Sequence, residues 1–307
     1  MQQRVHYQPT DPGIRWEKDP GIVIDVSDVG GNWRSITPNV IEVGAGFRMY
    51  YTESGPGLDY GSSPARILSA ISHDGTMWEP ELGVRIAPYE PGPGLRVVCP
   101  DVVPLLEGGY RRYFEGQPHN GPSTVMSAYS DEGIVWKADP GIRWGDDNAD
   151  FGSPRCIYVE SNEKTLYRLY FHQSSATIGD KTIVSALSED GLHFQKEPGV
   201  RIVQETPFET ATVYAPEVLY LGDGTYRMYY AGWSSEPLHG QILSATSSDG
   251  LNWTKDAKPS VVFGGRWDQV KCSEPCIMRL PDGCYRMFYE ANDEHGVWRI
   301  LSATTPA

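Results

Sequence analysis

Ile242-Leu243-Ser244-Ala245 decides the fold, because the same motif occurs five times along the chain at nearly constant spacing. The other copies are Ile67-Leu68-Ser69-Ala70, Val125-Met126-Ser127-Ala128, Ile183-Val184-Ser185-Ala186 and Ile300-Leu301-Ser302-Ala303. Successive serines of the motif are 58, 58, 59 and 58 residues apart. A repeat of this length indicates an array of similar supersecondary units, as in a solenoid or a β-propeller.

Each unit holds four short apolar or alternating runs separated by turn residues, which is the pattern of an antiparallel β-meander. In the fourth unit, the first three strands are predicted at residues 216–221, 226–231 and 241–246, and the fourth after Trp253. No stretch has a convincing helical pattern. The units begin at the prolines Pro38, Pro100, Pro154, Pro216 and Pro275. We therefore predict five units of four strands.

The two ends of the chain predict a closed ring. The fifth unit stops at Ala307, before its fourth strand, whereas residues 11–22 resemble residues 134–142, where the second unit has its fourth strand. We expect the N-terminal segment to complete the last unit and remove the exposed sheet edges. The predicted fold is an all-β, five-bladed β-propeller of four antiparallel strands per blade, forming one domain over residues 1–307.

Composition limits the kind of partner. The 307 residues include 26 basic and 40 acidic side chains, a net charge of −14, which argues against binding to nucleic acid. A neutral or cationic small ligand is easier to accommodate. No run of 18 apolar residues occurs and residues 1–6 do not resemble a secretory signal, so we expect a soluble, cytoplasmic protein without a membrane partner. Five cysteines without a CxxC pair indicate reduced thiols, and we expect neither cofactor nor metal.

Two sets of repeated residues are interpreted as structural. One aromatic position per unit is expected to fill the space between blades, and it is occupied by Trp16, Trp78, Trp136, Phe194 and Trp253. One arginine position per unit is expected to pair with carboxylates or backbone carbonyls, and it is occupied by Arg48, Arg111, Arg168, Arg227 and Arg286.

In a propeller the innermost strands converge on one axis, and polar residues at their starts form a candidate site. Because side chains alternate along a strand, both residues that flank each proline are expected to face the tunnel. The predicted ring consists of Asn39, Asp101, Arg155, Glu217, Glu274 and Cys276. A structural interpretation remains open, in which Arg155 only neutralises Asp101 and Glu217.

Further candidates for substrate binding lie on the same predicted face. The ends of the second strands supply Glu53, Glu115, His172, Trp233 and Glu290, and the loops that follow supply His119, His239 and His295. Trp233 is the candidate platform for stacking a ligand. The three loop histidines can bind a metal only if their loops converge, can donate hydrogen bonds to a sugar, or are ordinary loop residues.

The chain resembles the five-bladed glycoside hydrolases of families 43, 32 and 68 in its repeat and in three motifs. These motifs are Pro100-Asp101-Val102, Ala215-Pro216-Glu217-Val218 and Glu274-Pro275. The resemblance implies a general-base Asp opening the first blade, a second Asp in the next blade and an acid Glu opening the third. Only Asp101 is in register, because the first and third blades carry Asn39 and Arg155 at these positions.

We therefore hypothesise a glycoside hydrolase-like enzyme acting on a small carbohydrate or glycoside, with Asp101, Glu217 and Glu274 as catalytic carboxylates. Glycoside hydrolysis needs one protonated and one ionised carboxyl group. We assign Glu217 as the acid, Asp101 as the base, and Glu274 with Arg155 as positioning groups. Two alternatives remain: a cyclase, lyase or isomerase acting on a small neutral metabolite in the same pocket, and an inactive carbohydrate-binding propeller.

Overall fold

The computed structural model of the chain describes residues 10–27, 30, 32–57, 61–89, 92–161, 164–175, 181–222 and 224–306. Every regular element within these ranges is a β-strand, which confirms the predicted all-β class. The same ranges contain no helix long and apolar enough to cross a membrane. Residues 1–6, on which the expectation about a secretory signal rests, lie outside the described residues.

The repeat units are antiparallel meanders, in which each strand pairs with the next along the chain. The first consists of β2 (Arg34–Val43), β3 (Gly46–Ser54), β4 (Ala65–Ser72) and β5 (Glu79–Pro80). The second consists of β6 (Arg96–Pro104), β7 (Tyr110–Gln117), β8 (Thr124–Ser130) and β9 (Lys137–Ala138). The third consists of β10 (Ala149–Ser161), β11 (Lys164–Ser175), β12 (Lys181–Ser188) and β13 (Gln195–Lys196). The fourth consists of β14 (Thr212–Tyr220), β15 (Tyr226–Ser235), β16 (Leu238–Ser247) and β17 (Thr254–Lys255).

The last meander joins the two ends of the chain. It consists of β18 (Lys271–Arg279), β19 (Tyr285–Asn292), β20 (Trp298–Thr304) and β1 (Glu17–Lys18). β1 is antiparallel to β20, with Glu17 opposite Thr304 and Lys18 opposite Ala303. The N-terminal segment therefore pairs where the sequence predicted it.

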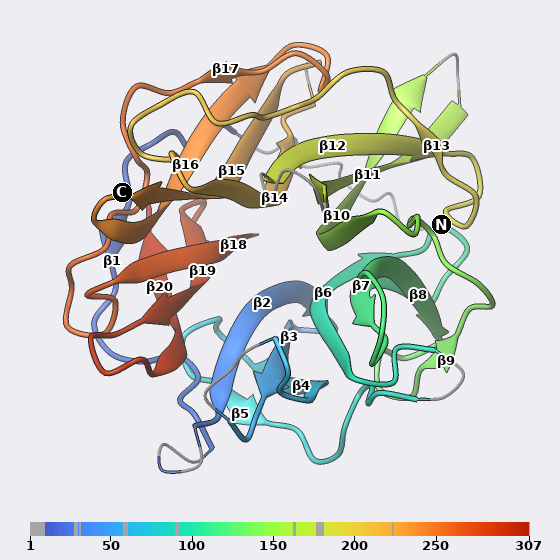
Figure 1. The fold of residues 1–307 in the computed structure, drawn as a ribbon, viewed down its shortest axis with the longest axis horizontal. Coiled ribbons are helices and arrows are strands. Elements are labelled where there is room, and N and C mark those ends of the chain that lie inside the picture. Colours follow the sequence, from blue (N-terminus) through green and yellow to red (C-terminus); the bar gives the residue numbers. More distant parts are fainter. Residues whose placement is uncertain are drawn as a thin grey trace.

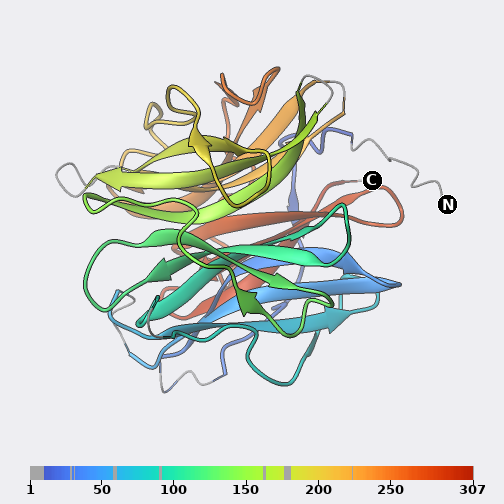
Figure 2. The same ribbon diagram turned by 90° about the vertical axis from the view of Figure 1, so that its right-hand side faces the viewer.

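The meanders are arranged around a common axis, with β2, β6, β10, β14 and β18 nearest the centre (Figure 1). In the side view the strands of the meanders run roughly along the axis down which Figure 1 looks (Figure 2). Edge-on aromatic pairs join neighbouring meanders, with ring centroids 5.5 to 6.1 Å apart: Trp16–Tyr229, Trp78–Phe288, Trp136–Tyr50, Phe194–Tyr113 and Trp253–Tyr170. The prediction that the repeated aromatic residues fill the space between units is confirmed.

The repeated arginines pair with carboxylates, as the sequence predicted. The ion pairs are Arg48–Glu81, Arg111–Asp139, Arg168–Glu197, Arg227–Asp11 and Arg286–Asp19. Asp11 and Asp19 belong to the N-terminal segment, so two of these pairs attach that segment to the last two meanders.

A β-bulge interrupts each innermost strand around its proline. The pairing register shifts there, as between Val98 and Asp101, and the residue before each proline has a positive φ of 46° to 54°. These left-handed residues are Thr37, Cys99, Ser153, Ala215 and Glu274. The bulge breaks the alternation of side chains, so the two residues that flank a proline do not share a face. The strands also begin four or five residues before the proline rather than at it.

Candidate active site

A cavity of about 510 Å³ lies among the first halves of the innermost strands. Residues directly before the bulge prolines line it: Thr37, Cys99, Ser153 and Glu274. Residues at the beginning of the same strands also line it: Arg34, Arg96, Thr212 and Lys271. The second strands add Glu115, His172, Trp233 and Glu290, and the remaining lining residues are Ile36, Lys181, Tyr214 and Trp298. Five predicted residues thus meet here, namely Glu115, His172, Trp233, Glu274 and Glu290.

The residues after the bulge prolines do not line this cavity, because they connect neighbouring innermost strands instead. Four of these side chains accept a hydrogen bond from a backbone N–H group of a neighbouring innermost strand. The pairs are Val102 N–H to Asn39 at 3.0 Å, Cys156 N–H to Asp101 at 2.7 Å, Ile277 N–H to Glu217 at 2.9 Å and Val40 N–H to Cys276 at 3.2 Å. Asn39 Nδ2 also donates to Asp101 Oδ1 at 3.2 Å. We call Asn39, Asp101, Arg155, Glu217 and Cys276 the inter-strand ring.

Arg155 is the member of the inter-strand ring that has no acceptor to offer. Its guanidinium donates from Nε to Glu217 Oε2 at 3.0 Å and from a terminal nitrogen to the Pro154 carbonyl at 2.9 Å. Burial raises the pKa of Asp101 to about 7, although Arg155 favours its charged form. Asn39, Asp101, Arg155 and Glu217, which were expected to face the tunnel, therefore lie outside the cavity lining and contact the neighbouring innermost strands.

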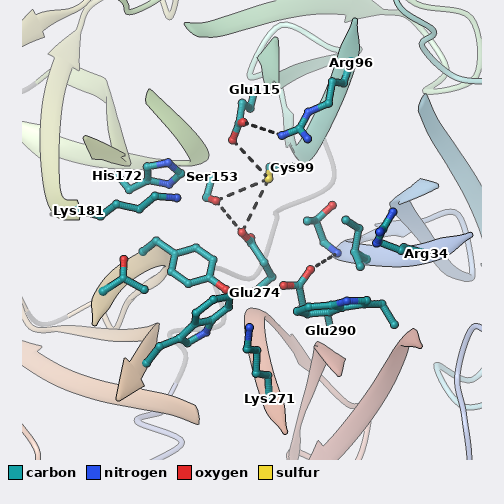
Figure 3. Close-up of a pocket in the computed structure, with 16 residues that line it drawn as sticks. Arg34, Arg96, Cys99, Glu115, Ser153, His172, Lys181, Lys271, Glu274 and Glu290 are labelled. Atoms are coloured by element: carbon teal, nitrogen blue, oxygen red, sulfur yellow. Dashed lines mark hydrogen bonds and ion pairs between the residues drawn. The ribbon is translucent and has the colours of Figure 1, made fainter. Parts of the chain in front are cut away.

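Three carboxyl groups remain in the cavity (Figure 3). Glu274 Oε1 accepts a hydrogen bond from Ser153 Oγ at 2.6 Å. Glu290 accepts from Ser273 Oγ at 2.7 Å and from the Thr37 N–H at 3.3 Å. Glu115 lies 3.8 Å from Arg96.

The Cys99 thiol lies between two of these carboxyl groups. Its sulfur is 3.8 Å from Glu115 Oε2 and 3.8 Å from Glu274 Oε1. The two oxygens are therefore no more than twice that distance apart. Burial, followed by the charges of Glu274 and Glu115, raises the pKa of Cys99 well above its usual value, so the group is a neutral thiol.

Burial raises the pKa of both Glu290 and Glu274. It raises the pKa of Glu290 to about 8, and the charge of Glu274 adds to this effect. Burial also raises the pKa of Glu274, but Arg155, 3.9 Å from Glu274 Oε2, and the hydrogen bond from Ser153 favour its ionised form. A pKa of about 8 keeps a proton on Glu290 at neutral pH, and the partners of Glu274 favour the ionised form of that group without offsetting its burial.

Cations and aromatic rings cover the rest of the cavity wall. Lys271 Nζ lies 3.6 Å from the Trp233 ring centroid, and Lys181 Nζ lies 5.1 Å from that of Tyr214. Burial and the neighbouring Lys181 lower the pKa of His172 well below its usual value, so its imidazole is neutral. His172 Nδ1 has no hydrogen-bond partner among the described residues.

Four other predicted residues lie outside the cavity lining. Thr52 pairs with Ile36, which lines the cavity, and Glu53 is the next residue along the strand. Because side chains alternate along a strand, Glu53 points to the face opposite that of Thr52, where it forms an ion pair with Arg66 at 2.6 Å. His239 stacks on Phe263, with ring centroids 4.0 Å apart, and His119 and His295 are exposed. Within the described ranges, no three His, Cys, Asp or Glu side chains are grouped to hold a metal.

Several lining residues were not predicted from the sequence, although they occupy repeated positions. Arg34, Arg96, Thr212 and Lys271 each lie four residues before a bulge proline. Lys181 and Trp298 each lie two residues before the first residue of a copy of the repeated motif, which is Ile183 or Ile300. The repeat could have identified both positions, but the innermost strands were expected to begin only at the prolines.

No family model matches the chain. Solved structures with a similar fold include a complex of BT0996 with RGII, with a TM-score of 0.80, 15% identity and coverage of 96% of this protein and 93% of that one. A thermostable family-43 glycoside hydrolase matches with a TM-score of 0.70 and 15% identity, and the match covers 91% of each protein. An endo-arabinase from Bacteroides thetaiotaomicron matches with a TM-score of 0.69 and 16% identity, and the match covers 94% of this protein and 98% of that one. The protein therefore has the fold of propeller glycoside hydrolases.

Proposed function

We propose that this protein is a glycoside hydrolase-like enzyme in which Glu290 and Glu274 cleave a glycosidic bond of a small carbohydrate. The observation that carries the proposal is the pair itself: two buried carboxyl groups in one cavity, where Glu290 holds a proton at neutral pH and Arg155 and Ser153 favour the ionised form of Glu274. Hydrolysis of a glycoside needs this combination. The fold shared with glycoside hydrolases and the similar structure of BT0996 in complex with RGII support a sugar-containing substrate.

Within this proposal, Glu290 is the general acid. It gives its proton to the glycosidic oxygen as the bond from that oxygen to the anomeric carbon breaks. Glu274 either removes a proton from the attacking water or attacks the anomeric carbon itself, and the separation of the two groups in the substrate complex decides which. Glu115, Trp233 and Trp298 bind the sugar by hydrogen bonding and stacking. These roles replace those first assigned to Asp101 and Glu217.

We further infer that residues 1–307 form one five-bladed β-propeller, which β1 closes by pairing with β20. The support is the pairing of Glu17 and Lys18 with β20, together with the aromatic contacts that join neighbouring meanders. Such a ring places the innermost strands around one site, which is why residues far apart in the sequence share the cavity.

The test is turnover of 4-nitrophenyl glycosides and of plant oligosaccharides by purified protein. Glu290→Gln and Glu274→Gln should each lower kcat at least a hundredfold on any substrate found, whereas Glu53→Gln, a buried carboxylate outside the cavity, should stay close to wild type. Wild-type rates in both cavity variants would refute the assignment. Binding of sugars without any product would identify a carbohydrate-binding propeller instead.

A further inference from the structure

Two lysines of the cavity form no direct ion pair in the described part of the chain, although the charge of Lys181 acts on Glu115 and Glu274 and that of Lys271 acts on Glu290. Lys181, at the start of β12, and Lys271, at the start of β18, form no ion pair and no hydrogen bond through Nζ within the described residues (Figure 3). The other lysines near carboxylates behave differently, as Lys18 and Lys255 pair with Asp268 and Glu209. Two partly buried ammonium groups are thus left available to a ligand.

Aromatic rings hold both ammonium groups at the cavity. Lys271 Nζ lies over Trp233 and Lys181 Nζ over Tyr214, and these two rings contact each other edge-on with centroids 5.6 Å apart. Figure 3 shows the two lysines reaching into the cavity from different sides. Cation–π contact steadies an ammonium group without neutralising it, so its charge remains available to an anion.

The charge of the cavity is opposite to that of the chain. Four basic side chains line it, Arg34, Arg96, Lys181 and Lys271, against the three carboxyl groups of Glu115, Glu274 and Glu290. Glu115 already lies beside Arg96, and Glu290 holds a proton at neutral pH. A positively charged cavity in a chain of net charge −14 concentrates anions at one place.

We propose that the cavity takes a sugar that carries a carboxylate, a uronic acid residue, and that Lys181 and Lys271 bind this carboxylate beside the Tyr214–Trp233 pair. This inference rests on the proposed function and narrows its substrate class. It differs from the expectation based on composition, since the net charge of the chain suggested a neutral or cationic ligand. Carboxylate and phosphate present similar chemistry to an ammonium group, so the test separates them.

The experiment measures binding by calorimetry, with free monosaccharides that no hydrolase can consume. Glucuronate and galacturonate are compared with glucose and galactose, and with glucose 6-phosphate and galactose 6-phosphate. We expect a uronate to bind at least tenfold more tightly than its neutral counterpart and its phosphate, with an affinity that falls as salt is added. Lys181→Met and Lys271→Met should each remove about tenfold of the uronate affinity and leave neutral sugars unchanged.

Controls separate charge from packing. Lys271→Arg keeps the charge and should keep most of the preference, and Lys137→Met, on the exposed strand β9, should have no effect. Equal affinity for uronates and neutral sugars in the wild type, or no binding of any uronate at millimolar concentration, would overturn the inference. Preference for the phosphates would overturn it in favour of a sugar phosphate. Turnover of neutral glycosides without any charge preference would overturn it and leave the proposed function intact.

Discussion

At the scale of single residues, Gly152 permits the closest approach in the cavity. A Cβ atom at this position would lie 1.9 Å from Glu115 Oε2 and 2.7 Å from His172 Cε1. Both neighbours are buried, and Glu115 is held beside Arg96 and Cys99, so neither side chain can move aside freely. Only a glycine at position 152 therefore leaves room for Glu115 and His172 where they lie.

Gly152→Ala should displace Glu115 and His172 and lower kcat/KM at least tenfold, at a stability cost of about 1 to 3 kcal/mol from overpacking. The comparison is Gly145→Ala, which crowds Thr124 outside the cavity lining and should cost stability without a matching loss of activity. Steady-state kinetics and thermal unfolding of both variants measure the two effects. Unchanged kinetics in Gly152→Ala would show that these groups do not contribute to turnover.

Glu290 predicts a dependence of stability on pH. The pKa of this group is raised from 4.5 to about 8 in the folded protein, so folding favours the protonated form. Its contribution to stability is fully present below pH 4.5 and is lost as pH rises to about 8, with about 1.4 kcal/mol for each unit of pKa displacement. A glutamine has no such dependence.

Glu290→Gln should therefore be inactive yet gain thermal stability over the wild type as the pH rises from about 5 to about 8. The glutamine oxygen can accept from Thr37 and its amide can donate to Ser273 Oγ, so the contacts of the protonated acid survive. Melting temperatures over this range, with the exposed Glu42→Gln as control, test the prediction. A difference from wild type that does not vary with pH contradicts it.

At the scale of elements, the bulge explains both what the sequence predicted and what it did not. Alternation and turn residues were enough to predict four strands per unit and the ends of the second strands, and Glu115, His172 and Glu290 were found by that route. The positive φ at residues such as Cys99 could not be predicted from the sequence, because residues other than glycine rarely adopt it. For this reason Asp101 and Glu217 were placed in the cavity although they connect neighbouring strands.

Asp101 tests this correction. Asp101→Ala leaves the buried Cys156 N–H without its acceptor and should cost about 1 to 3 kcal/mol of unfolding free energy. Asp101→Asn keeps an acceptor oxygen and should cost less. Both variants should retain kcat within a few fold, as measured by denaturant titration and kinetics. A folded, inactive Asp101→Asn protein would restore the role of general base that was first assigned to Asp101.

At the scale of the whole molecule, the contact of the N-terminal segment with later meanders carries the inferred ring. Trp16 packs on Tyr229 with ring centroids 5.5 Å apart, and Tyr229 Oη donates to the Gly13 carbonyl at 2.5 Å. The sequence predicted this arrangement because residues 11–22 match the missing part of the last unit. It could not predict the cavity charge, because −14 is the net charge of the whole chain and the cavity lining differs from it.

Trp16 and Trp78 occupy the same position in different units. Replacing each with alanine tests whether the N-terminal strand is an integral part of the fold. Each should cost about 3 to 5 kcal/mol if both rings fill equivalent spaces between meanders. Denaturant titration of the two variants gives the comparison. A cost for Trp78→Ala without one for Trp16→Ala would mean that β1 is peripheral and that the ring does not depend on it.

The pairing of β1 with β20 also sets an order of events during synthesis. Asp19 and Ser302, which share a hydrogen bond of 2.7 Å, are 283 residues apart. On the ribosome β1 emerges first and must wait until β20 has been made, while the intervening meanders can form beforehand. Because the last meander needs both β1 and β20, we expect it to be completed after the other four and β1 to be exposed to chaperones until then.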